Sequence, residues 1–138
     1  MIPGSETYPF LPMNPTAGPL GLMPLLPLRL ELRPNAVAVL GLLDTASAVN
    51  VLPYDVGLQL GAIWAQQTTN VQLTGNLASV PARGLVVTAI VGQFPPVRLA
   101  FAWAQVNTIP LILGQLNFFA EFDAYFSRAS AIFEVKPK

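Results

Sequence analysis

From Leu28 to residue 33, leucine alternates strictly with charged side chains. A period of two places apolar and polar side chains on opposite faces, which predicts a half-buried β-strand that starts near Leu25. Pro34-Asn35 is a turn signal, and the apolar run from Val37 to Leu43 is expected to return as the antiparallel partner. Because this second run carries no charge, we expect it to be more buried than the first.

Short apolar runs separated by glycine, proline or polar residues continue to the end of the chain. Their lengths and alternation favour strands, and the expected helices are short. One short helix is expected to be opened by Pro53, Tyr54 and Asp55 and to run through Leu60, where Gly61 stops it, and a single turn is expected between Gln115 and Phe119. The predicted fold class is therefore all-β with a short helix. Further strands are expected at Val49 to Leu52, Leu85 to Val91, Val97 to Ala104 and Ile109 to Leu113, with a closing hairpin of Glu121 to Phe126 and Ala131 to Val135.

Residues 1–24 contain six prolines and three glycines, which excludes a regular helix and makes a long strand unfavourable. The segment also holds Tyr8, Phe10 and several leucines, so it is too apolar for a freely solvated linker. We expect an extended, proline-rich N-terminal arm over residues 1–24 that lies along the domain or along a partner subunit. Residues 25–138 are expected to form the single folded domain.

The stretch from Gln66 to Gly84 is mostly polar, with Val71, Leu73 and Leu77 as its spaced apolar positions. It predicts a long hairpin with a mobile tip. Its tip would include Leu73, Thr74, Gly75 and Asn76.

The chain contains no histidine and no cysteine, which excludes Ser-His and Cys-His catalysis, disulfides and the usual zinc ligands. Glu121 and Asp123 could share a strand face, but no third ligand lies nearby in the sequence, so no metal site is predicted. Any acid-base chemistry without a cofactor has to come from the seven carboxylates. These are Glu6, Glu31, Asp44, Asp55, Glu121, Asp123 and Glu134.

The composition also bounds the partners. The chain is 53% hydrophobic and only 10% charged, which predicts a surface that packs against another subunit. The seven basic residues are scattered and the net charge is zero, so nucleic acid is not an expected partner. No apolar run is long enough to span a membrane, and the N-terminus lacks a cationic start, so an intracellular, cytoplasmic location is the default expectation.

One carboxylate, Asp44, stands at the end of the apolar run and is followed by four small residues, residues 45–48. An acid delivered from a buried strand into a tight turn is an arrangement that a water-activating site needs. The alternative is an aspartate that merely starts an Asx-type turn at a strand end.

The segment LLDTASAVNVLP, followed about sixty residues later by IPLILGQLNFF, resembles the retropepsin-like aspartic proteases. The closing AEFDAYFSRASAIFEV resembles the terminal hairpin of bacterial and cellular members with one lobe per chain, so the resemblance covers about residues 25–135. It implies an all-β, dimeric acid protease barrel. In that fold the Asp44-Thr45-Ala46 loop is held by a ψ-shaped crossing of Ile112, Leu113 and Gly114.

The resemblance implies an aspartic endopeptidase in which a water molecule is activated between the Asp44 carboxylates of a homodimer. Thr45 would bond across the twofold axis to the partner loop. Leu73, Thr74, Gly75 and Asn76 would belong to a flap that closes over an extended peptide or protein substrate. No cofactor and no metal are implied.

Three positions depart from the family pattern. Ala46 stands where the family has glycine, and Ala48 and Gln115 replace an aspartate-arginine pair of many viral members. Glycine permits close approaches that a Cβ disfavours. The alternative function is therefore a catalytically weak or inactive retropepsin-like module that dimerises or binds peptides.

Overall fold

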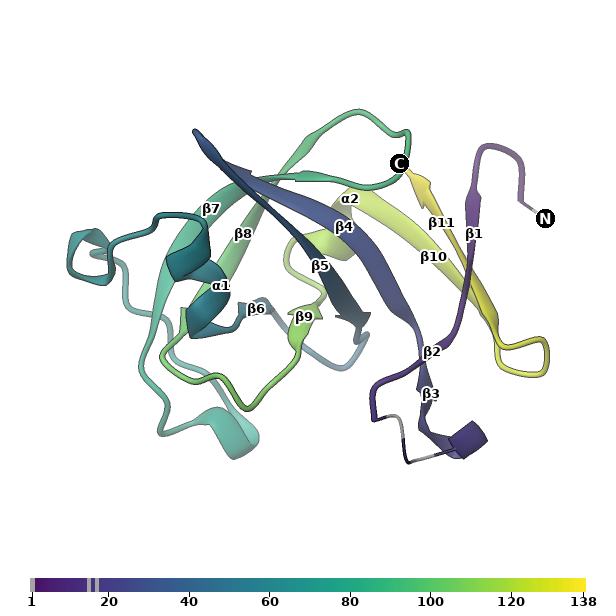
Figure 1. Ribbon diagram of the computed structural model, residues 1–138, viewed down its shortest axis with the longest axis horizontal. Helices are drawn as coiled ribbons and strands as arrows, with labels where there is room; N and C mark the ends of the chain where they lie inside the picture. Colours follow the sequence, from purple (N-terminus) through teal and green to yellow (C-terminus); the bar gives the residue numbers. More distant parts are fainter. Residues whose placement is uncertain (1, 15, 17) are drawn as a thin grey trace.

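The strand pair β4 (Leu25–Leu32) and β5 (Asn35–Leu43) forms the long antiparallel hairpin that the alternation predicts. The computed structural model describes residues 2–14, 16 and 18–138 of the chain. Figure 1 shows the hairpin, in dark blue, crossing the centre of the molecule. The expectation that β5 is the more buried strand is wrong, because its outward residues up to Leu40 are exposed while Leu26 and Leu30 of β4 are fully buried.

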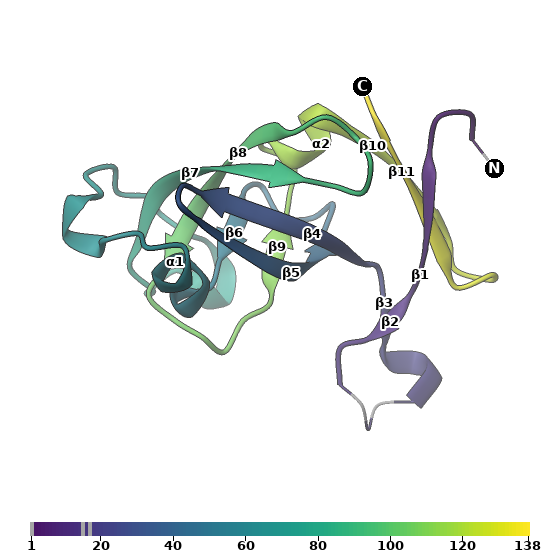
Figure 2. The ribbon, with the colours of Figure 1, turned by 45° about the horizontal axis from the view of Figure 1, so that its top comes forward.

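Six strands close into a barrel in the order β4-β5-β9-β6-β8-β7 (Figures 1 and 2). The all-β prediction is thus confirmed. The remaining barrel strands are β6 (Asn50–Leu52), β7 (Ala82–Ile90), β8 (Val97–Ala104) and β9 (Leu111–Leu113). The predicted strands match them within a few residues, because each has its own apolar run. The barrel interior is filled by fully buried side chains, among them Leu26, Leu30, Leu52, Leu99, Trp103 and Leu113.

The helix α1 (Tyr54–Gln59) follows Pro53 and packs against Trp103 of β8. Gly57 makes this approach possible, since a Cβ there would lie 2.2 Å from the Trp103 indole. Gly61, with φ of 81°, ends the segment as expected. Two single 3₁₀ turns, η2 (Trp64–Gln66) and η3 (Gly75–Leu77), follow.

The second helix, α2 (Phe118–Glu121), begins three residues later than the predicted turn at Gln115. The backbone N–H groups of Gln115 and Leu116 donate to the Ser47 and Ala48 carbonyls, and the residue before the helix, Asn117, has a φ of −127°, outside the helical range. The helix leads into β10 (Phe122–Ser127) and β11 (Ile132–Pro137), the closing hairpin that the sequence predicts.

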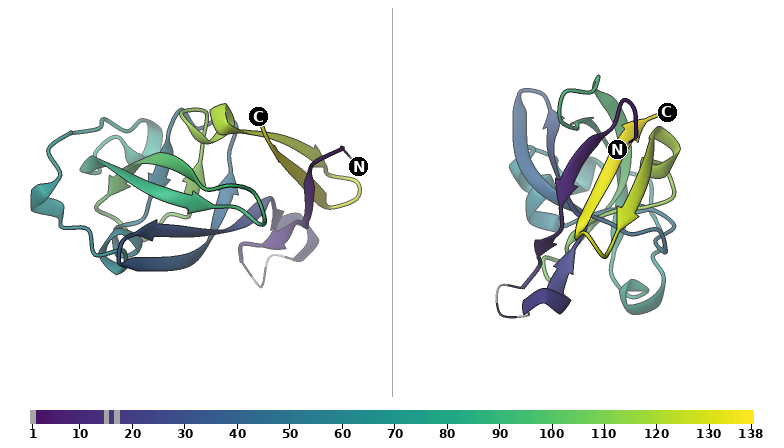
Figure 3. Two further views of the ribbon diagram at one scale, coloured as in Figure 1. Left: turned by 90° about the horizontal axis from the view of Figure 1, so that it is seen from above. Right: turned by 90° about the vertical axis from the view of Figure 1, so that its right-hand side faces the viewer.

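The N-terminal segment contributes a strand, β1 (Glu6–Pro9), that pairs antiparallel with β11. Figure 3 shows β1, β11 and β10 side by side as a separate sheet at one end of the barrel. Phe10 follows β1 into the core and is 8% exposed. The short pair β2 (Leu11–Pro12) and β3 (Leu22–Met23), with the turn η1 (Gly18–Gly21) between them, then leads into β4. The arm thus lies along the domain, and its separation at residue 24 stays a prediction.

Polar contacts also fix the arm. The Glu6 carboxylate accepts hydrogen bonds from the Tyr8 hydroxyl (2.7 Å) and the Gln93 backbone N–H (3.0 Å). Burial of Tyr8, reinforced by its hydrogen bond to Glu6, raises the pKa of the phenol well above its usual range. The phenol therefore remains a protonated donor.

The predicted long hairpin between Gln66 and Gly84 is wrong. Only its base is paired, with the Val71 N–H donating to Ala82 (3.0 Å) and the Gly84 N–H donating to Thr69 (2.8 Å). Beyond this base the chain forms an irregular loop around η3, because Leu73 turns inward and is 5% exposed in a small core with Val51 and the β8 alanines. Of the spaced apolar residues, Leu73 is thus buried in the small core, and the three do not form the apolar face of a strand.

No helix in the described part of the chain is long and apolar enough to cross a membrane. Over the same residues, no group of three or more acidic side chains is placed where it could hold a metal ion.

Candidate active site

Asp44 lies directly after β5, where the strand leaves the barrel wall. Its backbone N–H donates to the Leu113 carbonyl at 3.0 Å. The Oδ1 atom of Asp44 accepts from the Ala46 N–H at 3.0 Å, and the Asp44 carbonyl accepts from Ser47 at 3.1 Å. The Asx-type turn is therefore present, and it fixes the orientation of a half-buried carboxylate.

The strand β9 passes between β5 and β6 behind this loop. Ile112 pairs in parallel with Leu42 of β5 and antiparallel with Val51 of β6. The chain thus leaves β5, turns at Asp44 and returns as β6 on the far side of β9, which is the ψ-shaped arrangement expected from the sequence. The structure places Ile112, Leu113 and Gly114 at this crossing.

Gly114 is required by the close approach of the two segments. A Cβ at this position would lie 2.5 Å from the Val49 carbonyl oxygen and 2.7 Å from that of Ser47. These are backbone atoms of the Asp44 loop, which cannot move aside as a flexible side chain would. The next residue, Gln115, donates from Nε2 to the Thr45 carbonyl at 2.7 Å. A neutral amide thus connects the two segments.

A buried amide that the sequence interpretation missed supports the same crossing. Asn50 is the one buried polar side chain among the described residues, and it is fully buried. Its Oδ1 accepts from the Gly114 N–H (2.8 Å), and its Nδ2 donates to the Ala100 carbonyl (3.0 Å) and to Asn117 Oδ1 (3.3 Å). In the sequence, Asn50 is recognisable only as a single amide side chain in an apolar strand. Its hydrogen-bond partners are distant in the sequence and come together only in the folded chain.

A cavity of about 160 Å³ separates the Asp44 loop from the loop around η3. Ala46 and Ile112 line one wall, and Leu73 and Thr74 line the other. All the lining side chains are uncharged. Of the four residues expected in a flap, Gly75 and Asn76 do not line this cavity. Asp44 and Thr45 of the catalytic loop do not line it either.

Asp44 carries no cation beside it within the described part of the chain, where the ion pairs are Arg29 with Glu31 and Lys138 with Asp123. Thr45 and Ala46 are exposed. Among the described non-glycine residues only Ala131 has a positive φ (52°), so Ala46 has an ordinary backbone conformation. The alanine therefore strains no backbone, and it lines the 160 Å³ cavity.

Comparisons with known proteins agree with the fold. The chain is similar to the crystal structure of a retropepsin-like aspartic protease from Rickettsia conorii, with a TM-score of 0.63 and 12% sequence identity. The match covers 96% of this chain and 92% of that chain. No protein-family model matches, and no curated protein matches. The chain thus has the retropepsin-like single-lobe fold.

Proposed function

We propose that the chain is an aspartic endopeptidase that hydrolyses peptide bonds as a homodimer. The observation that carries the proposal is the position of Asp44 on a loop fixed by the β5-β9-β6 crossing, in a fold similar to that of an aspartic protease. The absence of histidine and cysteine leaves carboxylates as the acid-base groups. Asp44 is the carboxylate on that loop.

The proposed chemistry needs two carboxylates. One accepts a proton from the attacking water while the other donates a proton to the oxygen of the scissile carbonyl. Two adjacent carboxyl groups cannot both ionise, so the pair shares one proton and titrates as a unit. Because each chain supplies one Asp44, a second copy related by a twofold axis completes the dyad.

Exposed apolar residues near the loop support a second copy as the partner. Leu116, which pairs with Val49 in an isolated bridge, is 68% exposed, and Leu40 on β5 is 46% exposed. Large apolar side chains exposed on segments that adjoin the loop favour an intermolecular contact. In the proposed dimer, Thr45 bonds across the axis to the partner loop.

The proposed substrate is an extended peptide that lies between the Asp44 loop and the loop of residues 72–77. The uncharged walls of the 160 Å³ cavity would accept an apolar side chain. The backbone beside Leu73 and Thr74 would pair with the peptide as an added strand. Because Leu73 is anchored in the core, opening is expected to centre on the more exposed residues Thr74, Gly75 and Asn76.

The test is cleavage of a peptide library by the purified protein between pH 3 and pH 9, with Asp44→Asn as the variant. We expect cleavage to be fastest below neutral pH and to fall by about 10²- to 10⁴-fold in the variant. Asp55→Asn, which changes an exposed carboxylate at the start of α1, is the matched control and should keep the wild-type rate. Equal cleavage by wild type and Asp44→Asn, or a rate that rises steadily to pH 9, would contradict the proposal.

The second candidate is a non-catalytic module that dimerises or binds peptides, and it is favoured by the methyl group of Ala46. Because the backbone at Ala46 is unstrained, Ala46→Gly should leave the fold intact and give the water more space. Cleavage that is equal or faster in Ala46→Gly supports the peptidase. Saturable peptide binding without cleavage by either protein supports the module.

A further inference from the structure

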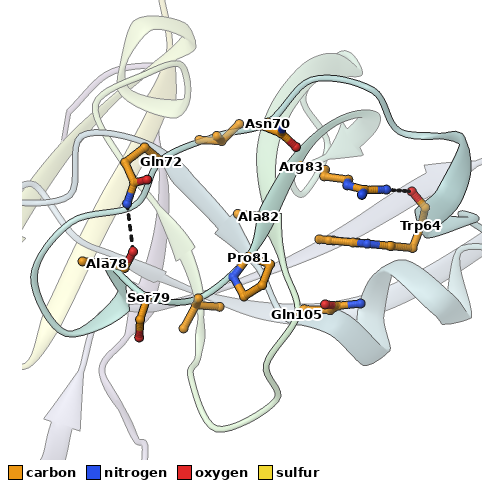
Figure 4. A pocket seen from close by; sticks show the side chains of 11 residues that line it. Trp64, Asn70, Gln72, Ala78, Ser79, Pro81, Ala82, Arg83 and Gln105 are labelled. Carbon is orange, nitrogen blue, oxygen red and sulfur yellow. Dashed lines mark hydrogen bonds between the residues drawn. The ribbon is translucent and has the colours of Figure 1, made fainter.

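A second cavity, of about 410 Å³, is larger than the cavity of 160 Å³ beside the Asp44 loop. It is lined by Trp64 and by residues 70–72 and 78–83 of the loop that follows Trp64. Figure 4 shows it between the two legs of this loop, with Asn70 and Gln72 on one leg and Ser79 and Arg83 on the other. Gln105, from the end of β8, closes the third side. The volume is in the range of small-molecule sites.

Arg83 is held in a fixed orientation at this cavity. Its guanidinium carbon lies 4.6 Å from the centre of the Trp64 ring, and its Nη1 donates to the Trp64 carbonyl at 2.7 Å. A guanidinium carries five N–H donors in a planar fork, so further donors remain after this bond. Arg83 takes part in neither of the two ion pairs found among the described residues.

Apart from Arg83, the cavity is lined by apolar side chains, such as Val71 and Val80, and by neutral hydrogen-bonding groups. Asn70, Ser79 and Gln105 are exposed and bring two amides and a hydroxyl to the same space, and no acidic residue lines it. Gln72 is already occupied, because its Nε2 donates to Leu73 (2.9 Å) and Ala78 (2.8 Å) and so braces the loop. A single cation surrounded by uncharged donors suits a ligand with one negative charge.

We propose that this cavity binds a carboxylate group. The planar fork of arginine matches the two oxygens of a carboxylate, and amide and hydroxyl donors can complete its hydrogen bonding. A phosphate dianion would keep an unneutralised charge here, since the lining holds only one cation. Binding does not require peptidase activity. Gln72 also lines the 160 Å³ cavity, so the ligand would contact the proposed substrate loop from its opposite side.

The experiment is an NMR titration of ¹⁵N-labelled protein with sodium propionate, a monocarboxylate, against sodium chloride at equal ionic strength. We expect saturable shifts of the Trp64 indole N–H and of the Asn70 and Gln105 amides. The side-chain amide of Asn50, which is fully buried at the β5-β9-β6 crossing and does not line this cavity, should not move. Arg83→Gln should raise the dissociation constant at least about tenfold, as the loss of a charge-assisted bond requires.

The matched control is Arg98→Gln, which removes an exposed arginine outside this cavity and should leave the titration unchanged. Gln105→Ala removes a lining donor without touching the Trp64 contact, and weaker binding by this variant supports the site even if Arg83→Gln does not fold. The carboxylate could belong to a polypeptide side chain or to a small free acid. Binding of the peptide Gly-Glu-Gly with blocked ends, but not of Gly-Gln-Gly, identifies a polypeptide side chain as its source. Shifts that do not saturate, an unchanged titration in Arg83→Gln and Gln105→Ala, or tighter binding of inorganic phosphate would overturn the proposal.

Discussion

At the scale of single residues, the ψ-shaped crossing depends on the missing side chain of Gly114. Gly114→Ala would place a methyl group against the backbone oxygens of Val49 and Ser47. We expect it to lower the free energy of unfolding by about 1–3 kcal/mol, the usual cost of overpacking. Urea denaturation followed by tryptophan fluorescence measures the change.

Gly84→Ala is the matched control. Its Cβ would meet Thr69 at 3.6 Å, an ordinary contact, so the free energy of unfolding should change by no more than about 0.5 kcal/mol. Equal stability of the two variants would show that the Asp44 loop can shift to make room for a methyl group.

Glu134 predicts a pH dependence of stability. Hydrogen bonds from the Ser5 hydroxyl and the Ile2 N–H hold the pKa of its carboxyl below the usual range. A lowered pKa in the folded state stabilises the fold above the unfolded pKa, and this stabilisation is lost as the pH falls through the folded value. The stability advantage of wild type over Glu134→Gln should therefore be present at pH 7 and shrink below about pH 4.3.

Urea midpoints of both proteins from pH 7 down to pH 3 check this prediction. Glu31→Gln is a suitable comparison, since Glu31 lies on β4 and pairs with an exposed arginine of the same strand. A constant difference between wild type and Glu134→Gln over the whole range would mean that the ionised carboxylate does not hold the arm.

At the scale of elements, the N-terminal arm is joined to the C-terminal sheet by Phe10. This ring lies in the core, 6.0 Å from the Phe133 ring and 5.5 Å from the Arg128 guanidinium carbon. Phe10→Ala should lower the free energy of unfolding by about 3–5 kcal/mol, as for other buried phenylalanines. The measurement is again urea denaturation.

Met13→Ala tests whether the effect is specific, because Met13 is 43% exposed on the same arm and should change stability little. A small loss for Phe10→Ala would mean that the arm detaches without disturbing the barrel.

The sequence predicts those elements whose signal is local. The strands of the main hairpin and the closing hairpin follow from alternation, and the Asp44 and Gly114 positions follow from the two quoted motifs. Other features depend on partners distant in the sequence. The β1 strand is hidden by prolines and pairs with β11, more than a hundred residues away. Leu73 and Asn50 acquire their roles only when the second core and the crossing form around them.

At the scale of the whole molecule, the proposed dyad predicts how activity responds to mixing. When wild-type and Asp44→Asn chains are mixed one to one and exchange freely, about one quarter of the dimers contain two wild-type chains. Because only these dimers are expected to be active, the mixture should have about one quarter of the activity of the same amount of wild-type protein. The peptide cleavage rate at constant total protein measures this.

Mixing wild type with Asp55→Asn is the control and should leave the rate unchanged. Half the activity in the mixture with Asp44→Asn would mean that each chain acts alone. Specific activity should also fall on dilution as dimers dissociate.

The insertion of β9 between β5 and β6 has a consequence for how the chain reaches its fold. The Asp44 N–H cannot meet the Leu113 carbonyl until the sixty-eight residues between them are present and folded back. Contacts so distant in sequence form slowly, because the entropy of closing the loop is lost before the contact is gained. During synthesis from the N-terminus, we therefore expect the loop that carries Asp44 to become ordered only after the ribosome has released most of the chain.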